Sequence, residues 1–226
     1  MKIGILQAGH TPDDLAPTMG DYDRLYSTLL DGYGFTFEAY PVVDMEFPDT
    51  ITDCDGWLIS GSRHGAYEDH PWIPRLEQII RDIYADGRPM IGVCFGHQII
   101  AQALGGKVEK YDGGWSVGYT EYDFDGQKVP LNAWHQDQVT RRPTDAKVIA
   151  STNFCENAAL VYGDKIWSIQ PHPEFNAAFL DGLMKSRGKG IVPDEIMAAA
   201  SEKLDKPTAS AAIADQMAAF FKKERA

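Results

Sequence analysis

Residues 88–105, RPMIGVCFGHQIIAQALG, place one cysteine between two glycines at the junction of two predicted elements. The apolar run before Cys94 has the length of a strand buried on both faces, and the segment after it has a helical repeat of apolar residues. Strand, Gly-x-Cys-x-Gly and helix form the thiol counterpart of the Gly-x-Ser-x-Gly nucleophile elbow. Such a turn is expected to present Cys94 at the carboxyl end of its strand.

The surroundings of Cys94 are typical of a reactive cysteine. Gly92 and Gly96 let the chain turn sharply, and the helix that follows directs unpaired N–H groups and the positive end of its dipole at the sulfur. The alternative is a buried structural cysteine, because free cysteines are among the most buried residues. A catalytic interpretation therefore needs a base elsewhere in the chain.

A candidate base follows a second strand-like segment, IWSIQP, at residues 166–171. A cysteine nucleophile needs a base, and the base needs a third group that fixes its orientation. His172 and Glu174 lie two residues apart, so in an extended chain both side chains project to the same side. A lone histidine is more often structural or solvated, but together with Cys94 this pair predicts a Cys–His–Glu triad.

The segments Gly92–Gln98 (GVCFGHQ) and Pro171–Glu174 (PHPE) together resemble the motifs of the class I (triad-type) glutamine amidotransferases. The resemblance extends over about residues 1–175 and is greatest to stand-alone members similar to the glutaminase domain of GMP synthase. It implies that Cys94 is the nucleophile, His172 the base and Glu174 the group that orients the base. It also implies a flavodoxin-like α/β fold.

The turn after the predicted strand 56–60 matches the family only in part. Family members carry a Ser-Gly-Gly-Pro-type turn here, whose backbone N–H helps to form the oxyanion hole. Gly61 matches that pattern, whereas Ser62 and Arg63 depart from the usual Gly-Pro. The resemblance assigns the Gly61 and Phe95 N–H groups as oxyanion donors, and the alternative is an ordinary glycine turn. Other polar residues of this loop, His64, Tyr67, Glu68 and His70, are candidates for substrate contact or plain solvation.

A third segment, WHQD at residues 134–137, resembles the family's aromatic-Ser-His-x-Asp segment beside the substrate pocket. His135 remains an alternative base, but it lacks a glutamate two residues on. We therefore expect His135 and Asp137 to shape the pocket. Gln98 corresponds to a family residue that contacts the γ-glutamyl substrate.

The order of predicted elements indicates one α/β domain. Strands and helices alternate as far as residue 105, which predicts a mostly parallel central sheet flanked by helices. Tyr22, Leu25, Tyr26 and Leu29 form the apolar face of a helix expected at 22–30, and residues 11–19 are expected to form a loop. Short strands separated by glycine-rich or polar turns predict a small antiparallel sheet between residues 107 and 170. The single domain is expected to have a core at about 1–187 and a helical extension at about 188–226, with helices at 175–187, 193–204 and 209–223.

Composition excludes several classes of function. The net charge of −12 argues against broad attraction to nucleic acid or anionic membranes. Three cysteines, an odd number, do not suggest a disulfide framework. No signal-peptide pattern or membrane-length apolar run is present, so a cytoplasmic protein is expected. The sequence has no Walker phosphate loop and no metal-type Cys/His cluster, so neither a cofactor nor a metal is expected.

The chemistry that the resemblance implies is hydrolysis of the γ-glutamyl amide bond of glutamine, or of another small γ-glutamyl compound, through a thioester. The favoured interpretation is a stand-alone hydrolase, because the altered turn at residues 62–64 could accommodate a substrate other than glutamine. The alternative is a glutaminase subunit that delivers ammonia to a separate synthetase chain. A catalytically silent binding or regulatory protein is a third possibility, and the intact Cys94, His172 and Glu174 argue against it.

Overall fold

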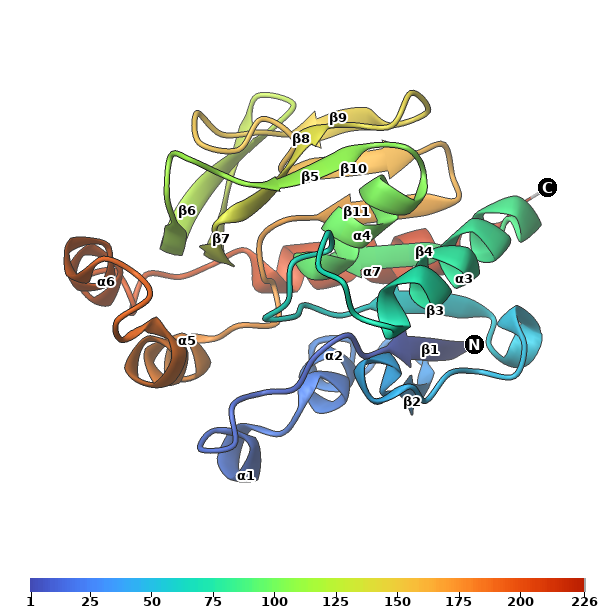
Figure 1. Cartoon of the computed structure of the whole chain (residues 1–226), viewed down its shortest axis with the longest axis horizontal. Coiled ribbons are helices and arrows are strands. Elements are labelled where there is room, and N and C mark those ends of the chain that lie inside the picture. The colour runs from blue at the N-terminus through green and yellow to red at the C-terminus, as the bar shows by residue number, and fades with distance from the viewer. Residues whose placement is uncertain (226) are drawn as a thin grey trace.

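The computed structural model describes residues 1–225, and a seven-stranded sheet is the largest element of that part of the chain (Figure 1). In spatial order the strands are β2 (Thr36–Tyr40), β1 (Lys2–Leu6), β3 (Gly56–Ile59), β4 (Met90–Val93), β11 (Ile166–Ile169), β10 (Ala159–Tyr162) and β9 (Lys147–Ala150). The pairings from β2 to β11 are parallel, and β10 and β9 add antiparallel pairings at one edge. The predicted mostly parallel α/β fold is therefore confirmed.

Two hydrophobic cores lie on opposite faces of this sheet because side chains alternate along each strand. Leu58 packs in one core with the apolar faces of α2 (Tyr22–Leu29) and α7 (Ser210–Lys222). Its neighbours Trp57 and Ile59 pack in the other core with α3 (Trp72–Asp86) and α4 (Phe95–Ala103). All residues of β3, β4 and β11 are buried, as continuous apolar strands in the middle of a parallel sheet should be.

The antiparallel region differs from the single small sheet that was expected. Within residues 1–225 it forms two two-stranded sheets, one of β5 (Lys107–Lys110) and β8 (Asp137–Arg141), the other of β6 (Ser116–Phe124) and β7 (Gln127–His135). Figure 1 shows both in the part of the molecule that holds β9 and β10, with β6 and β7 at the left of the view. Strand β8 was not predicted. It starts within the WHQD segment, and its pairing with β5 is set by contacts distant in sequence.

The remaining elements are short. They are α1 (Ala16–Met19), the 3₁₀ turns Val42–Asp44 and Ile51–Asp53, α5 (Ala177–Leu183), the π-helical turn Met184–Gly188 and α6 (Asp194–Ser201). Helix α1 lies in a segment that was expected to be a loop. The three predicted C-terminal helices are present with shorter bounds. Met217 and Phe221 of α7 are buried in the main core, so this helix is an integral part of the packing.

The described part of the chain contains no helix that is both long enough and apolar enough to span a membrane.

Candidate active site

Cys94 connects β4 to α4 in an unusual backbone conformation, with φ 52° and ψ −103°. Positive φ is uncommon for residues other than glycine and persists only where the surrounding structure enforces it. The Cys94 N–H donates to the Ile169 carbonyl at 2.8 Å, and its carbonyl accepts from the Gln98 N–H at 3.0 Å. These bonds hold the turn on the strand side and on the helix side, so the thiol position is fixed by the backbone.

The two glycines of the turn are required by close packing. A Cβ on Gly96 would lie 2.3 Å from the Ile59 carbonyl oxygen, and a Cβ on Gly92 would lie 2.6 Å from the Gly96 carbonyl carbon. The Gly96 N–H also donates to the Ser60 carbonyl at 3.1 Å. Strand β3, the turn and α4 therefore approach too closely for side chains at these positions. This is the physical reason for the Gly-x-Cys-x-Gly pattern.

His172 reaches the same edge of the sheet because β11 lies parallel to and beside β4. Its N–H donates to the Asn132 carbonyl at 2.8 Å, which ties the segment to β7. Its Nδ1 lies 2.7 Å from Glu174 Oε1, and both side chains are buried. The ring stacks on Phe175, with centroids 3.9 Å apart and planes 4° apart. The expected contact of Glu174 with the imidazole is present and the ring orientation is fixed, but the chain makes a turn at Pro173 and Glu174 where an extended segment was expected.

The Glu174 carboxylate has a second partner that sequence reasoning missed. The Tyr26 hydroxyl donates to Glu174 Oε1 at 2.8 Å across 148 positions of sequence. In the sequence Tyr26 is one of several apolar positions on the α2 face, and nothing local distinguishes its hydroxyl. The contact depends on α2 packing against the segment that follows β11, so only the tertiary structure reveals it.

The electrostatics around His172 favour its protonated form. Burial alone lowers the pKa of an imidazole, but the nearby Glu174 and Cys94 outweigh it and raise the pKa of His172 to about 10. Nε2 of His172 makes no hydrogen bond to any group within residues 1–225. Since Nδ1 is held by Glu174, Nε2 is the nitrogen left for a reacting group beside Cys94.

The two expected oxyanion donors lie at the ends of neighbouring elements. The Phe95 N–H begins α4, whereas the Gly61 N–H follows β3 and hydrogen-bonds the Tyr26 hydroxyl, which acts to lower the pKa of that tyrosine. A Cβ on Gly61 would lie 3.0 Å from His172 Cε1, so this glycine is in direct contact with the imidazole. The Gly61 and Phe95 N–H groups therefore flank the Cys94–His172 pair, and the Gly61 N–H also has Tyr26 as a partner.

A cavity of about 440 Å³ opens onto Cys94 and His172. Gln98, His135 and Asp137, the residues expected at the substrate, line the same cavity. The Gln98 side-chain amide donates to the Asp137 carbonyl at 2.9 Å and to Gln170 Oε1 at 3.1 Å, so the protein itself holds its NH₂ group. The volume lies within the range of small-molecule sites.

The two buried histidines of the cavity differ in charge state. His135 Nδ1 lies 3.2 Å from the Asp137 backbone carbonyl, and within residues 1–225 the ring has no carboxylate partner. Burial therefore lowers the pKa of His135 to about 3, and the ring is neutral at physiological pH. Because the carboxylate partner belongs to His172, the geometry supports the triad arrangement over His135 as the base.

Several cavity residues were not anticipated from the sequence. Basic side chains line it at Lys110 and Arg187, in addition to Arg63 of the altered turn. Arg187 also donates to the His10 carbonyl at 2.7 Å, which fixes its guanidinium. The acidic side chains Glu68 and Asp137 line the same cavity, so the basic groups make up only part of its wall. The sequence does not predict a place for Arg187 in the cavity, because its segment was predicted only to be helical.

Comparisons with known proteins agree with this geometry. The family model described as glutamine amidotransferase class-I matches residues 26–182, which contain the Cys94 turn and the His172 segment. The chain belongs to the class I glutamine amidotransferase family.

Individual relatives are similar to this chain over most of its length. The chain is 34% identical over 188 residues to γ-glutamyl peptidase 4 of Arabidopsis thaliana, covering 75% of each chain. It is 30% identical over 198 residues to γ-glutamyl-L-1-hydroxyisopropylamide hydrolase of a Pseudomonas species, covering 76% of this chain and 65% of that protein. A glutamine amidotransferase structure from Methylobacillus flagellatus superposes with a TM-score of 0.73 at 22% identity, covering 98% of this chain and 91% of that one, which shows a shared fold.

Proposed function

We propose that this protein is a cysteine-dependent hydrolase of γ-glutamyl amide bonds that acts without a partner chain. The observation that carries the proposal is the buried His172–Glu174 pair, 2.7 Å apart, beside a cysteine held on a strained strand-to-helix turn. The relatives named γ-glutamyl peptidase and γ-glutamyl amide hydrolase support the γ-glutamyl class of substrate.

In this mechanism the Cys94 thiolate attacks the γ-carbonyl carbon, and the tetrahedral oxyanion is stabilised by the Gly61 and Phe95 N–H groups. The His172 imidazolium donates its proton to the departing amine as the C–N bond breaks, leaving a γ-glutamyl thioester on Cys94. Neutral His172 then accepts a proton from water, whose oxygen attacks the thioester. Collapse releases glutamate and restores the thiolate–imidazolium pair.

The raised pKa of His172 has a direct role in the first half of this sequence. At neutral pH a pKa of about 10 keeps the imidazole protonated, so the acid that the leaving amine needs is already present. Glu174 stabilises that charge, and Tyr26 in turn holds the carboxylate. We assign Glu174 and Tyr26 as positioning residues, because neither reaches the reacting carbon.

The basic part of the cavity wall supports an anionic group on the substrate. A γ-glutamyl group carries an α-carboxylate, and Arg63, Lys110 and Arg187 are the cationic side chains on the cavity wall. A guanidinium can bind a carboxylate through two parallel hydrogen bonds. We therefore propose that the basic part of the wall holds the α-carboxylate while the γ-amide lies over Cys94.

The test is release of glutamate by the isolated protein from glutamine, γ-glutamyl amides and γ-glutamyl peptides. We expect turnover without any added chain, and loss of that turnover in Cys94→Ala. Cys54→Ala is the matched control, because Cys54 is also a buried thiol but does not line the cavity.

Two results would contradict the proposal. Undiminished turnover in Cys94→Ala would exclude the cysteine mechanism. Glutaminase activity that appears only after a synthetase chain is added would instead support the ammonia-delivering subunit.

A further inference from the structure

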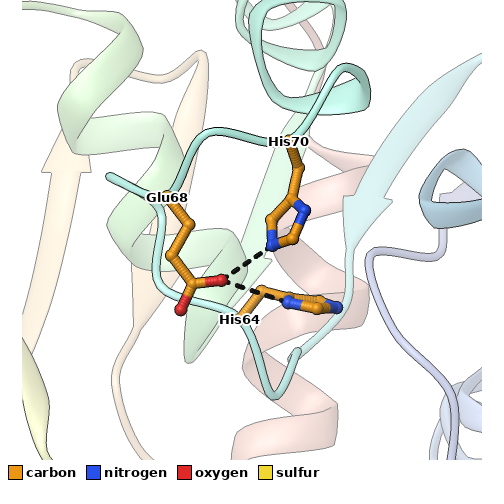
Figure 2. A group of neighbouring side chains, drawn as sticks. All are labelled: His64, Glu68 and His70. Atoms are coloured by element: carbon orange, nitrogen blue, oxygen red, sulfur yellow. Dashed lines mark hydrogen bonds and ion pairs between the residues drawn. The ribbon is translucent and has the colours of Figure 1, made fainter.

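Two imidazoles and one carboxylate of the loop between β3 and α3 converge on a common point (Figure 2). Glu68 Oε2 lies 3.2 Å from His64 Nδ1 and 2.8 Å from His70 Nε2. The three atoms all lie within 4.8 Å of one another, and the two ring centroids are 4.3 Å apart. The sequence was expected to hold no metal-type cluster of cysteines and histidines, so folding of this loop creates a grouping that spacing did not reveal.

We propose that His64, Glu68 and His70 form a binding site for a divalent transition-metal ion, with Zn²⁺ the best match. Two histidines and one glutamate are a known ligand set of open zinc sites. In a tetrahedral site with bonds of about 2.0–2.1 Å, neighbouring ligand atoms are about 3.4 Å apart. The two separations of 2.8 and 3.2 Å are close to that value, so small side-chain rotations would admit the ion.

The loop is organised by contacts independent of the cluster. The His64 N–H donates to Ser62 Oγ at 3.1 Å, and the Glu68 N–H donates to the Gly65 carbonyl at 3.0 Å. The His70 ring stacks on Trp72, with centroids 5.9 Å apart and planes 12° apart. These contacts orient the ligands before an ion arrives, and such support is typical of metal sites.

His10, another histidine with carboxylate partners, has a different geometry. His10 Nδ1 lies 2.6 Å from Asp21, and His10 Nε2 lies 2.8 Å from Asp44. One ring there stands between two carboxylates that approach its two nitrogens from different sides, which is the geometry of an ion-pair bridge. At His64, Glu68 and His70 three ligand atoms face one point, which is the geometry of chelation.

The site lies at the edge of the proposed active site. His64 and Glu68 line the cavity that contains Cys94, and Trp72 packs on Phe95, the residue after Cys94, with ring centroids 5.5 Å apart. Three protein ligands leave a fourth position on a tetrahedral ion for water or for an anionic group that enters the cavity. The metal site itself does not depend on the hydrolase proposal.

Calorimetric titration with Zn²⁺ tests the site, using metal-free protein that carries Cys94→Ala. That substitution removes the competing thiolate–imidazole pair of Cys94 and His172. We expect one ion per chain with a Kd of about 1 µM or below. His64→Ala and His70→Ala should each weaken binding by at least about 10–100-fold. Loss of a residue that only hydrogen-bonds a metal ligand already costs that much, and these substitutions remove a ligand itself. His10→Ala is the matched control and should bind as the parent does.

Glu68→Gln, which keeps the shape of the side chain, provides a further check if an alanine variant fails to fold. It should also weaken binding, and circular dichroism would report that the fold is retained. Co²⁺ in the Zn²⁺ position should give visible d–d bands of a low-coordinate nitrogen and oxygen site, without a thiolate charge-transfer band. Absence of stoichiometric binding, or equal affinity in the His64, His70 and His10 variants, would overturn the proposal.

Discussion

The cavity has imidazole–carboxylate groups on two of its walls, and they differ chiefly in their access to water. The His172 and Glu174 side chains are 3% and 0% exposed, whereas those of His64, Glu68 and His70 are 18%, 41% and 33% exposed. Charges interact strongly in a dry site and weakly where water screens them. The buried pair can therefore set a protonation state, while the exposed group adds little stability and remains accessible to a ligand.

The largest expected effect of this difference is on catalysis. Glu174→Gln keeps the shape of the side chain but removes the charge that holds His172 protonated. We expect kcat/KM for the best γ-glutamyl substrate to fall by about 10³–10⁴-fold, as for the acidic member of other triads. Glu68→Gln is the same substitution in the exposed group, where water already screens the charge. It should change the free energy of unfolding by less than about 0.5 kcal/mol. Wild-type kinetics in a folded Glu174→Gln variant would show that the buried carboxylate does not set the protonation state of His172.

The next largest effect is on stability, through the glycines of the two walls. In Gly96→Ala the new Cβ meets the Ile59 carbonyl at 2.3 Å, a backbone contact that cannot give way. In Gly65→Ala it meets the ring of Tyr67 at 2.9 Å, and that side chain is exposed and can move. Urea denaturation should show a loss near the upper end of about 1–3 kcal/mol for Gly96→Ala and under about 1 kcal/mol for Gly65→Ala. Equal losses would mean that the turn at Cys94 is no more rigid than the loop.

The pH dependence of the unfolding free energy reports on the protonation of His172 in the buried pair. Folding raises the pKa of His172 from the ordinary 6.5 to about 10, so the folded protein binds this proton more tightly than the unfolded chain does. The resulting stabilisation is complete below about pH 6.5 and is lost as the pH rises through about 10. Unfolding free energies should therefore converge between wild type and His172→Gln over that interval. A constant difference at all these pH values would show that His172 is not held protonated.

A smaller effect is expected from Tyr26→Phe, which removes one hydrogen bond to Glu174 and leaves the ring packing intact. A hydrogen bond to a charged group contributes about 1.5–3 kcal/mol, and the substitution should lower the free energy of unfolding by up to that amount. Because the carboxylate keeps its bond to His172, activity should fall by much less than in Glu174→Gln. A loss as large as that of Glu174→Gln would mean that the carboxylate cannot hold His172 without the tyrosine, which would contradict the minor role given to Tyr26.

The features that the sequence predicts correctly are those encoded locally. The Cys94 turn needs two glycines at fixed offsets, and Glu174 meets His172 two residues away through a tight turn at Pro173 and Glu174. The parallel sheet follows from alternation of apolar strands and amphipathic helices. In each case the sequence pattern is local, even where the contact behind it is not, since Gly96 is required by its approach to Ile59 of β3.

The features that the sequence does not predict depend on packing between distant segments. The Tyr26 hydroxyl reaches Glu174, and Arg187 reaches the cavity, only because separate elements pack against one sheet edge. Strand β8 forms because β5 offers it a partner. His64, Glu68 and His70 are close in sequence, but their side chains converge only through the path of an irregular loop, which carries no periodic signal.

The most direct test of the account is to identify the atom that carries the acyl group during turnover. Acid quenching of the isolated protein mixed with its best γ-glutamyl substrate, followed by peptide mass spectrometry, would trap a thioester. We predict a γ-glutamyl group on the peptide that contains Cys94, and none on the peptides that contain Cys54 or Cys155. Glutamate release with no acyl group on Cys94, under conditions that preserve thioesters, would contradict the nucleophile assignment on which the proposed mechanism depends.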